Sequence, residues 1–269
     1  TILHDNKRDR RAYTWDKMIA LDTKIFINRL IENGYSHLCI VPCSFAKNVI
    51  NEAINNPDIE YIPSASEAVA VSIASGLKMG GKKPIVIVQS SGLTNMGSNI
   101  TSLLKPYGVT FPILTSWRTY KDGDSEIQHQ HLAIHLPELI KAYGYEYAIL
   151  NQGDLDTAIS QINIFNSSFV IGVVKKDTFN KVKLNDEHKS DLSSYTPRSK
   201  FLISLNNKFK DTNTIFIGTT GNTAREMYSF MKDTNNFYMG GLTTTGRYKN
   251  IDLTYILFDN EQNKSTGGQ

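Results

Sequence analysis

Glu67 stands at the start of an apolar helix pattern, where a carboxylate can play either of two roles. It can complement the partial positive charge of the helix N-terminus. It can also point across the edge of a sheet towards a ligand and exchange a proton with it. Ser64 and Ser66 precede it as possible helix caps. From the residues alone, both interpretations of Glu67 stay open.

Candidate anion-binding residues follow several apolar runs. Ser44 comes after a short apolar run and opens a predicted helix, and Ser91 lies in a serine-glycine turn after another run. Arg118 and His129 follow a later run, on the side where open α/β sheets bind ligands. Backbone N–H groups at helix starts bind dianions well, as do Arg, Lys and His side chains. Each of these residues could equally be a cap, a turn residue or an exposed basic residue.

The histidines and cysteines raise the questions of a metal site and of a cysteine nucleophile. The His-Gln-His sequence at 129–131, with His135 four residues later, suggests zinc because closely spaced histidines can chelate a metal. No acidic or cysteine ligand has a matching spacing, so the alternative is a loop histidine that contacts substrate or solvent. Cys39 and Cys43 are spaced C-x3-C without a second pair, which indicates a reducing compartment. Cys43 has no adjacent base, which argues against a nucleophile.

The elements that must position these residues alternate between strand and helix patterns. Apolar runs of strand length lie at residues 38–41, 59–62, 85–88, 111–115, 146–150 and 169–174. Helix patterns separate them, and this alternation is typical of βαβ units in a parallel sheet. In the clearest helix, one face carries Val69, Ala70, Ile73, Ala74 and Leu77, and we interpret its stripe of Val69, Ile73 and Leu77 as core packing. Asp22 is a predicted cap of the first helix.

The apolar pattern divides the chain into four parts. Residues 1–20 form a predicted N-terminal tail or linker, and residues 21–175 form one doubly wound α/β domain. Residues 176–196 are rich in Lys, Asp, Ser and Asn and are a predicted surface linker. Residues 197–269 begin a second α/β unit, with predicted strands at 214–217, near Phe237 and at 253–258, and a helix at 222–231.

Composition excludes several functional classes. The chain has 269 residues, of which 40% are hydrophobic and 20% charged, as in a globular protein of one large or two modest domains. It lacks an apolar run of about 18 residues and an apolar signal core near its start, so we expect a cytoplasmic protein. The net charge of +3 is too small to indicate nucleic acid as the main partner. Acidic residues interleave with the bases at 7–11, which favours a solvated tail.

A series of short motifs spans nearly the whole chain. The first blocks are Ser66-Glu67-Ala68-Val69-Ala70, Gly76 and residues 85–95. The others are residues 41–45, 116–118, 128–129, 219–221, 225–226, 259–262 and 265–269. In their joint order these blocks resemble thiamine-diphosphate-dependent decarboxylases, and most closely the phosphonopyruvate decarboxylase family. The resemblance implies a thiamine-diphosphate-binding fold of two doubly wound parallel-sheet domains, the second incomplete in this sequence.

The resemblance also assigns roles to individual residues. It implies that Glu67 is the catalytic carboxylate, which holds a ring nitrogen of the cofactor's aminopyrimidine. Mg²⁺ would be held by the side-chain oxygen of Asn260 and the backbone carbonyl of Gln262. The implied cofactor-binding residues are Gly92, Asn95, Thr219, Thr220, Gly221 and Met239. The implied substrate-binding residues are Ser44, Ser91, Arg118 and His129.

The resemblance breaks off at one junction. In the family, the strand matching 237–241 leads to a glycine-rich helix start, another strand and a Gly-Asp-Gly motif whose aspartate holds the metal. Here Gly241 runs directly into residues 242–248, which resemble the helix after that motif. We therefore expect that an internal segment near 241–242 and the C-terminal part of the domain are missing, as if pieces of a longer protein were joined. Residues 1–15 are a candidate for another such junction.

The reaction implied is decarboxylation of phosphonopyruvate to phosphonoacetaldehyde and carbon dioxide, a step in phosphonate biosynthesis. A homo-oligomer, a dimer or higher, with active sites shared between subunits is implied, with no nucleic-acid or membrane partner. One alternative is a decarboxylase of sulfopyruvate or another 2-oxo acid. Another is a catalytically silent thiamine-fold assembly protein, which the missing Gly-Asp-Gly motif would explain. A Rossmann dehydrogenase is disfavoured because no G-x-G-x-x-G follows the first strand.

Overall fold

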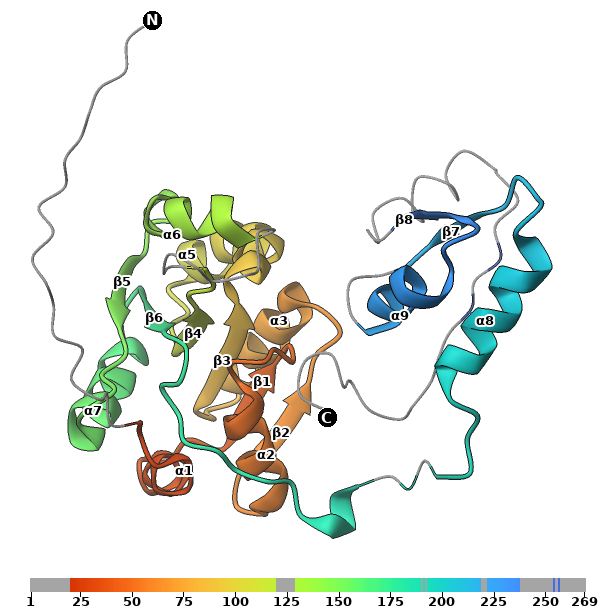
Figure 1. The fold of residues 1–269 in the computed structure, drawn as a ribbon. Helices are drawn as coiled ribbons and strands as arrows, with labels where there is room; N and C mark the ends of the chain where they lie inside the picture. Colours follow the sequence, from red (N-terminus) through yellow and green to blue (C-terminus); the bar gives the residue numbers. More distant parts are fainter. Residues whose placement is uncertain are drawn as a thin grey trace, which may run out of the picture.

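A computed structural model of the chain describes residues 20–119, 129–189, 191, 193–218, 222–237, 254 and 256. Within these residues the chain forms a six-stranded sheet and a two-stranded sheet (Figure 1). None of the described helices is both long enough and apolar enough to cross a membrane.

Every strand pair of the six-stranded sheet is parallel. The strands are β1 (His37–Ile40), β2 (Glu60–Pro63), β3 (Pro84–Gln89), β4 (Ile113–Ser116), β5 (Glu146–Ile149) and β6 (Val170–Val174). They lie in the order β2-β1-β3-β4-β6-β5, which confirms the predicted parallel α/β fold. The chain leaves β1 towards one edge and β3 towards the other. The carboxyl ends of these two strands therefore form the switch point where open α/β sheets bind ligands.

Helices cover both faces of this sheet (Figure 1). One face carries α1 (Thr23–Glu32), α2 (Lys47–Asn55) and α7 (Leu155–Phe165). The other face carries α3 (Glu67–Met79), α6 (Gln130–Ala142) and a broken helical segment. That segment consists of η1 (Ser90–Met96), α4 (Gly97–Asn99), η2 (Ile100–Leu104) and α5 (Lys105–Tyr107).

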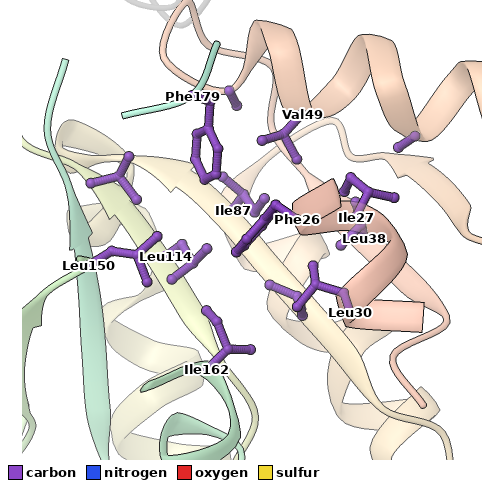
Figure 2. Packing of buried hydrophobic residues seen from close by; sticks show 14 of the residues in the cluster. Phe26, Ile27, Leu30, Leu38, Val49, Ile87, Leu114, Leu150, Ile162 and Phe179 are labelled. Atoms are coloured by element: carbon purple, nitrogen blue, oxygen red, sulfur yellow. The ribbon is translucent and has the colours of Figure 1, made fainter. Parts of the chain in front are cut away.

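Buried side chains alternate between the two helical layers along β3. Ile85 and Ile87 belong to the cluster with α1, α2 and α7, whereas Val86 and Val88 belong to the cluster with α3 and α6. This alternation is the period of two expected for a strand that is buried on both faces. In the first cluster Ile87 lies among side chains from α1, α2 and α7 (Figure 2).

Two predicted helix caps are confirmed. Asp22 accepts a hydrogen bond from the backbone N–H of Ile25 at 3.0 Å and so caps α1. Ser66 accepts from the backbone N–H of Val69 at 3.4 Å and caps α3. Glu67 is therefore the first residue of α3, as the sequence predicted.

Two local predictions are wrong. Val69 is not a core residue in this chain, because its side chain is 42% exposed, whereas Ala70 and Ala74 of the same predicted face are buried. Small side chains let α3 lie close to the sheet, which turns Val69 outwards. Ser44 does not open α2, which begins at Lys47, because Ser44 lies in a turn closed by the bond from Ala46 N–H to the carbonyl of Cys43 at 3.1 Å.

The start of the predicted linker packs against α2. Three asparagines of α2 donate side-chain hydrogen bonds to backbone carbonyls of residues 179–183, at 3.3, 2.8 and 2.9 Å: Asn48, Asn51 and Asn55. Their spacing of three and four residues places them on one face of the helix. At the start of this segment, the ring of Phe179 packs against that of Phe26, with 5.0 Å between the ring centroids (Figure 2). The chain after β6 is therefore fixed on the first layer of helices.

The second α/β unit is smaller in the described residues. Strands β7 (Ile215–Ile217) and β8 (Asn235–Phe237) pair in parallel. Helices α8 (Arg198–Phe209) and α9 (Asn222–Phe230) share a small core of Leu202 and Met227. A short 3₁₀ turn, η4 (Asp186–His188), precedes this unit. The strand predicted at 253–258 falls largely outside the described residues.

Candidate active site

The structure brings Glu67 against the turn that follows β3. The side chain of Glu67 is only 8% exposed. A Cβ added at Gly92 would lie 2.3 Å from Glu67 Oε1 and 2.4 Å from its Cγ, far closer than real atoms approach. The carboxyl group therefore rests on the backbone of Gly92, and any side chain at this position would displace it.

Asn95 holds the other oxygen of the same carboxyl group. Its side-chain nitrogen donates a hydrogen bond to Glu67 Oε2 at 2.8 Å. Gly92 and Asn95 both belong to η1, where the hydroxyl of Thr94 also donates to the carbonyl of Ser91 at 2.8 Å. The two residues predicted to line a cofactor are thus the two that surround the predicted catalytic carboxylate.

Arg118 joins the loops that follow β1 and β4. It is buried, and its guanidinium donates a hydrogen bond to the hydroxyl of Ser44. The guanidinium carbon lies 5.0 Å from the centroid of the Phe45 ring, a distance at which cation–π attraction operates. Two of the four predicted substrate residues are therefore in direct contact.

Cys43 lies beneath this arginine. Burial raises the pKa of its thiol, the positive charge of Arg118 acts to lower that pKa, and the negative charge of Glu67 acts to raise it. The side chain is almost fully buried, so the thiol stays protonated at neutral pH. This agrees with the prediction that Cys43 is no nucleophile.

Gln89 connects the other two predicted substrate residues. Its amide nitrogen donates to the hydroxyl of Ser91 at 2.7 Å and lies 3.4 Å from Nε2 of His129. Gln89 belongs to the motif at residues 85–95 but was given no role in the site, although its place as the last residue of β3 was a usable signal. Polar groups at or just after the carboxyl ends of β1, β3 and β4 thus gather at the same end of the sheet.

Ser116 was also missed as a site residue. Its hydroxyl is buried and has no hydrogen-bond partner among the described residues. It lines a small, mostly apolar hollow beneath the loop after β1, together with Cys43, Phe45 and Leu114. A buried unsatisfied hydroxyl is costly, so this one marks a place where a polar group of a ligand or a water would be stabilised.

The zinc alternative gains no support from the described residues. The rings of His131 and His135 lie tilted against each other, with centroids 4.7 Å apart, on an exposed side of α6. Nowhere in the described part of the chain do three or more His, Cys, Asp or Glu side chains gather as a metal site would require. The predicted residues Thr219, Thr220, Gly221, Met239, Asn260 and Gln262 lie outside the described residues.

The described residues fit the pyrimidine end of thiamine diphosphate. A carboxylate can accept about four hydrogen bonds, and Asn95 uses one of those on Glu67, so capacity remains for a ring N–H. Gly92 presents backbone and no side chain beside that carboxylate, as a site that admits a flat ring requires. The residues that would hold the diphosphate and its metal lie outside the described residues.

Comparisons with known proteins point to thiamine diphosphate as the cofactor. A family model described as "Thiamine pyrophosphate enzyme, N-terminal TPP binding domain" matches residues 23–154; thiamine pyrophosphate is thiamine diphosphate. Phosphonopyruvate decarboxylase from Streptomyces viridochromogenes is 24% identical, over 88% of this chain and 72% of its own. Sulfopyruvate decarboxylase from Methanosarcina acetivorans is 32% identical, over 45% of this chain and 30% of its own.

A solved structure, benzoylformate decarboxylase from Polynucleobacter necessarius, aligns with a TM-score of 0.42 and 13% identity. The alignment covers 77% of this chain and 40% of that one. The family match and the curated relatives confirm the resemblance found in the motifs. The chain is a homologue of the phosphonopyruvate decarboxylases, and its residues 23–154 match the cofactor-binding domain of thiamine-diphosphate enzymes.

Proposed function

We propose that the protein decarboxylates phosphonopyruvate to phosphonoacetaldehyde and carbon dioxide, with thiamine diphosphate and Mg²⁺. The observation that carries this proposal is the Glu67 carboxyl group resting on Gly92 at the switch point of the sheet. Two phosphonopyruvate decarboxylases from Streptomyces species match 88% of the chain, which supports phosphonopyruvate as the substrate.

Glu67 has a defined task in this reaction. Thiamine diphosphate, when bound, supplies the sink for the electrons that a 2-oxo acid releases with carbon dioxide. The Glu67 carboxylate holds a proton at the pyrimidine ring nitrogen that faces it. The shielding of this carboxyl group from water strengthens the hydrogen bond, because electrostatic interactions are stronger where solvent is excluded.

The metal end of the cofactor belongs to the second domain in this proposal. Asn260 would supply a side-chain oxygen and Gln262 a backbone carbonyl to Mg²⁺, which prefers octahedral oxygen ligands. Thr219, Thr220, Gly221 and Met239 would contact the cofactor nearby. The proposed boundaries are residues 21–175 for the pyrimidine domain, 176–196 for the linker and 197–269 for the diphosphate domain.

Because the two ends of the cofactor would be bound by two different domains, we also propose a homo-oligomer. As in the family that the motifs resemble, Glu67 of one subunit would face Asn260 of another. The active site would then be complete only in a dimer or larger assembly. The oligomeric state of the full-length protein, measured by light scattering, tests this part.

The anionic head of the substrate would bind at the polar ends of β1, β3 and β4. Arg118 and Ser44 form one group there, and Ser91 and His129 flank Gln89 in the other. A guanidinium suits a phosphonate because its planar set of N–H donors matches the tetrahedral oxygens and carries a permanent charge.

Sulfopyruvate is the second candidate substrate. Three relatives named as sulfopyruvate decarboxylases or their alpha subunits match at 31% to 33% identity, over 33% to 45% of the chain. Their matches are shorter than those of the phosphonopyruvate decarboxylases but higher in identity. Because a sulfonate carries one negative charge and a phosphonate up to two, the same basic residues could hold either.

A substrate comparison tests the proposal. The full-length protein is supplied with thiamine diphosphate and Mg²⁺ and given phosphonopyruvate, sulfopyruvate or pyruvate, and released carbon dioxide is measured. We expect the highest kcat/KM for phosphonopyruvate. A higher kcat/KM for sulfopyruvate would identify sulfopyruvate as the substrate instead. No turnover of any of these 2-oxo acids would favour a catalytically silent assembly protein.

A further inference from the structure

The side chain of Asn95 has an unusual use for an exposed asparagine. It lies on an exposed part of η1, yet its amide nitrogen is committed to Glu67 Oε2 at 2.8 Å. An amide oxygen at this place would face a carboxylate oxygen and be repelled, so the nitrogen must be the inward atom. The contact therefore has a fixed polarity, with Asn95 as donor and Glu67 as acceptor.

Asn95 and Gly92 together fix the carboxyl group from two sides. A glutamate side chain has three rotatable bonds, and its carboxyl plane turns freely unless contacts hold it. Gly92 blocks movement on the side of Oε1, and Asn95 anchors Oε2. Both residues lie on η1, which is held in the second core by the fully buried side chains of Leu93 and Met96. The Glu67 carboxyl group is thus held in a fixed position relative to the packed core.

We propose that Asn95 is a positioning residue for the proposed reaction, which orients the Glu67 carboxylate instead of binding the cofactor itself. The inference rests on the proposed function of Glu67. It differs from the expectation that Asn95 lines the cofactor, because in that case cofactor affinity would depend on Asn95. A positioning residue affects the rate at which the bound cofactor is activated and leaves its affinity nearly unchanged.

Asn99 provides a matched control. It lies one turn farther along the same segment, and its amide nitrogen donates to the hydroxyl of Ser72 at 3.0 Å and to the carbonyl of Ala68 at 3.3 Å. Asn99 therefore joins the segment to α3 just as Asn95 does, but the two bonds end away from Glu67. Replacing Asn95 and Asn99 in separate variants therefore distinguishes a role in positioning Glu67 from a role in attaching this segment to α3.

The test compares Asn95→Ala, Asn95→Leu and Asn99→Ala with wild type in the full-length protein. Asn95→Leu nearly keeps the shape and removes the donor without adding a charge beside Glu67, so it guards against a folding effect of the alanine. Three quantities are measured: kcat, the Kd of thiamine diphosphate, and the rate of deuterium exchange at the reactive carbon of the bound cofactor. For both Asn95 variants we expect kcat and exchange to fall about ten- to a hundredfold. Their Kd should change less than about threefold, and Asn99→Ala should resemble wild type in all three.

Other results would overturn the inference. If the Asn95 variants exchange deuterium as fast as wild type, or if Asn99→Ala is slowed as much, Asn95 has no special link to Glu67. If Kd rises as much as kcat falls, Asn95 binds the cofactor directly. If wild type neither binds thiamine diphosphate nor exchanges the proton, the proposed function fails, and this inference fails with it. If wild type and both Asn95 variants turn over substrate at the same rate, the role of Asn95 is contradicted while the proposed function stands.

Discussion

Gly92→Ala is the change whose effect can be worked out most directly from the structure. The added Cβ would lie 2.3 to 2.5 Å from three atoms of Glu67, whereas ordinary contacts of a Cβ begin at 3.4 Å. The carboxyl group must therefore move by about 1 Å, and a displacement of this size at a catalytic group costs about a hundredfold in rate. Because Glu67 can swing its side chain away, we expect the free energy of unfolding to fall by only about 1 kcal/mol.

Gly153→Ala is the matched control for this experiment. Gly153 lies in an exposed turn after β5, and a Cβ there meets its nearest atom at 3.9 Å, which is an ordinary contact. Decarboxylation kinetics and urea unfolding of both variants give the comparison. We expect Gly153→Ala to keep full activity and Gly92→Ala to lose it while remaining folded. A fully active Gly92→Ala protein would refute the argument that Glu67 works from its position on Gly92.

Three further variants test other contacts. Asn51→Ala removes a buried hydrogen bond of 2.8 Å to the backbone of Val182 and should lower the free energy of unfolding by about 1–2 kcal/mol in urea titration. Asn55→Ala removes two bonds, one donated to the carbonyl of Lys183 and one accepted from the N–H of Asn185, but both are exposed to water and should cost less; equal losses would contradict this account. Arg118→Lys keeps the charge but loses the planar fork, so we expect KM for phosphonopyruvate to rise about tenfold in steady-state assays with the Kd of thiamine diphosphate unchanged. An unchanged KM would remove Arg118 from the substrate site. Burial raises the pKa of Cys39 to about 12. The folded protein therefore keeps this proton while the unfolded chain loses it, so stability should fall as pH rises from about 9 towards 12, less steeply in Cys39→Ala; identical slopes would contradict it.

Much of the first domain could be predicted from the sequence because its strands are buried on both faces. Such strands form continuous apolar runs, and the run at 85–88 lies within β3 (Pro84–Gln89). The helix caps at Asp22 and Ser66 were also predictable, because a side-chain oxygen before an apolar helix pattern has a local function.

The sequence failed where packing overrides local pattern. Val69 fits the predicted apolar face of α3 by spacing, but within that face it is the small residues Ala70 and Ala74 that are fully buried, because they let the helix approach the sheet. Helical spacing alone does not say which of two adjacent faces is buried.

The contacts of the candidate site are invisible to local reasoning. Glu67 and Gly92 lie 25 positions apart, on α3 and after β3, and meet only because both segments pack beside the same edge of the sheet. Spacing could suggest a carboxylate at a helix start and a glycine turn, but not that one rests on the other. The motif resemblance assigned both residues to the cofactor, and the structure shows that they are in contact with each other.

Glu67→Gln tests the central claim most directly. Glutamine nearly preserves the size of the side chain but has no negative charge to share a proton with a ring nitrogen. In the full-length protein, supplied with thiamine diphosphate and Mg²⁺, we expect the variant to fold and bind cofactor while its kcat for phosphonopyruvate falls at least about a hundredfold. Turnover at the wild-type rate would contradict the account.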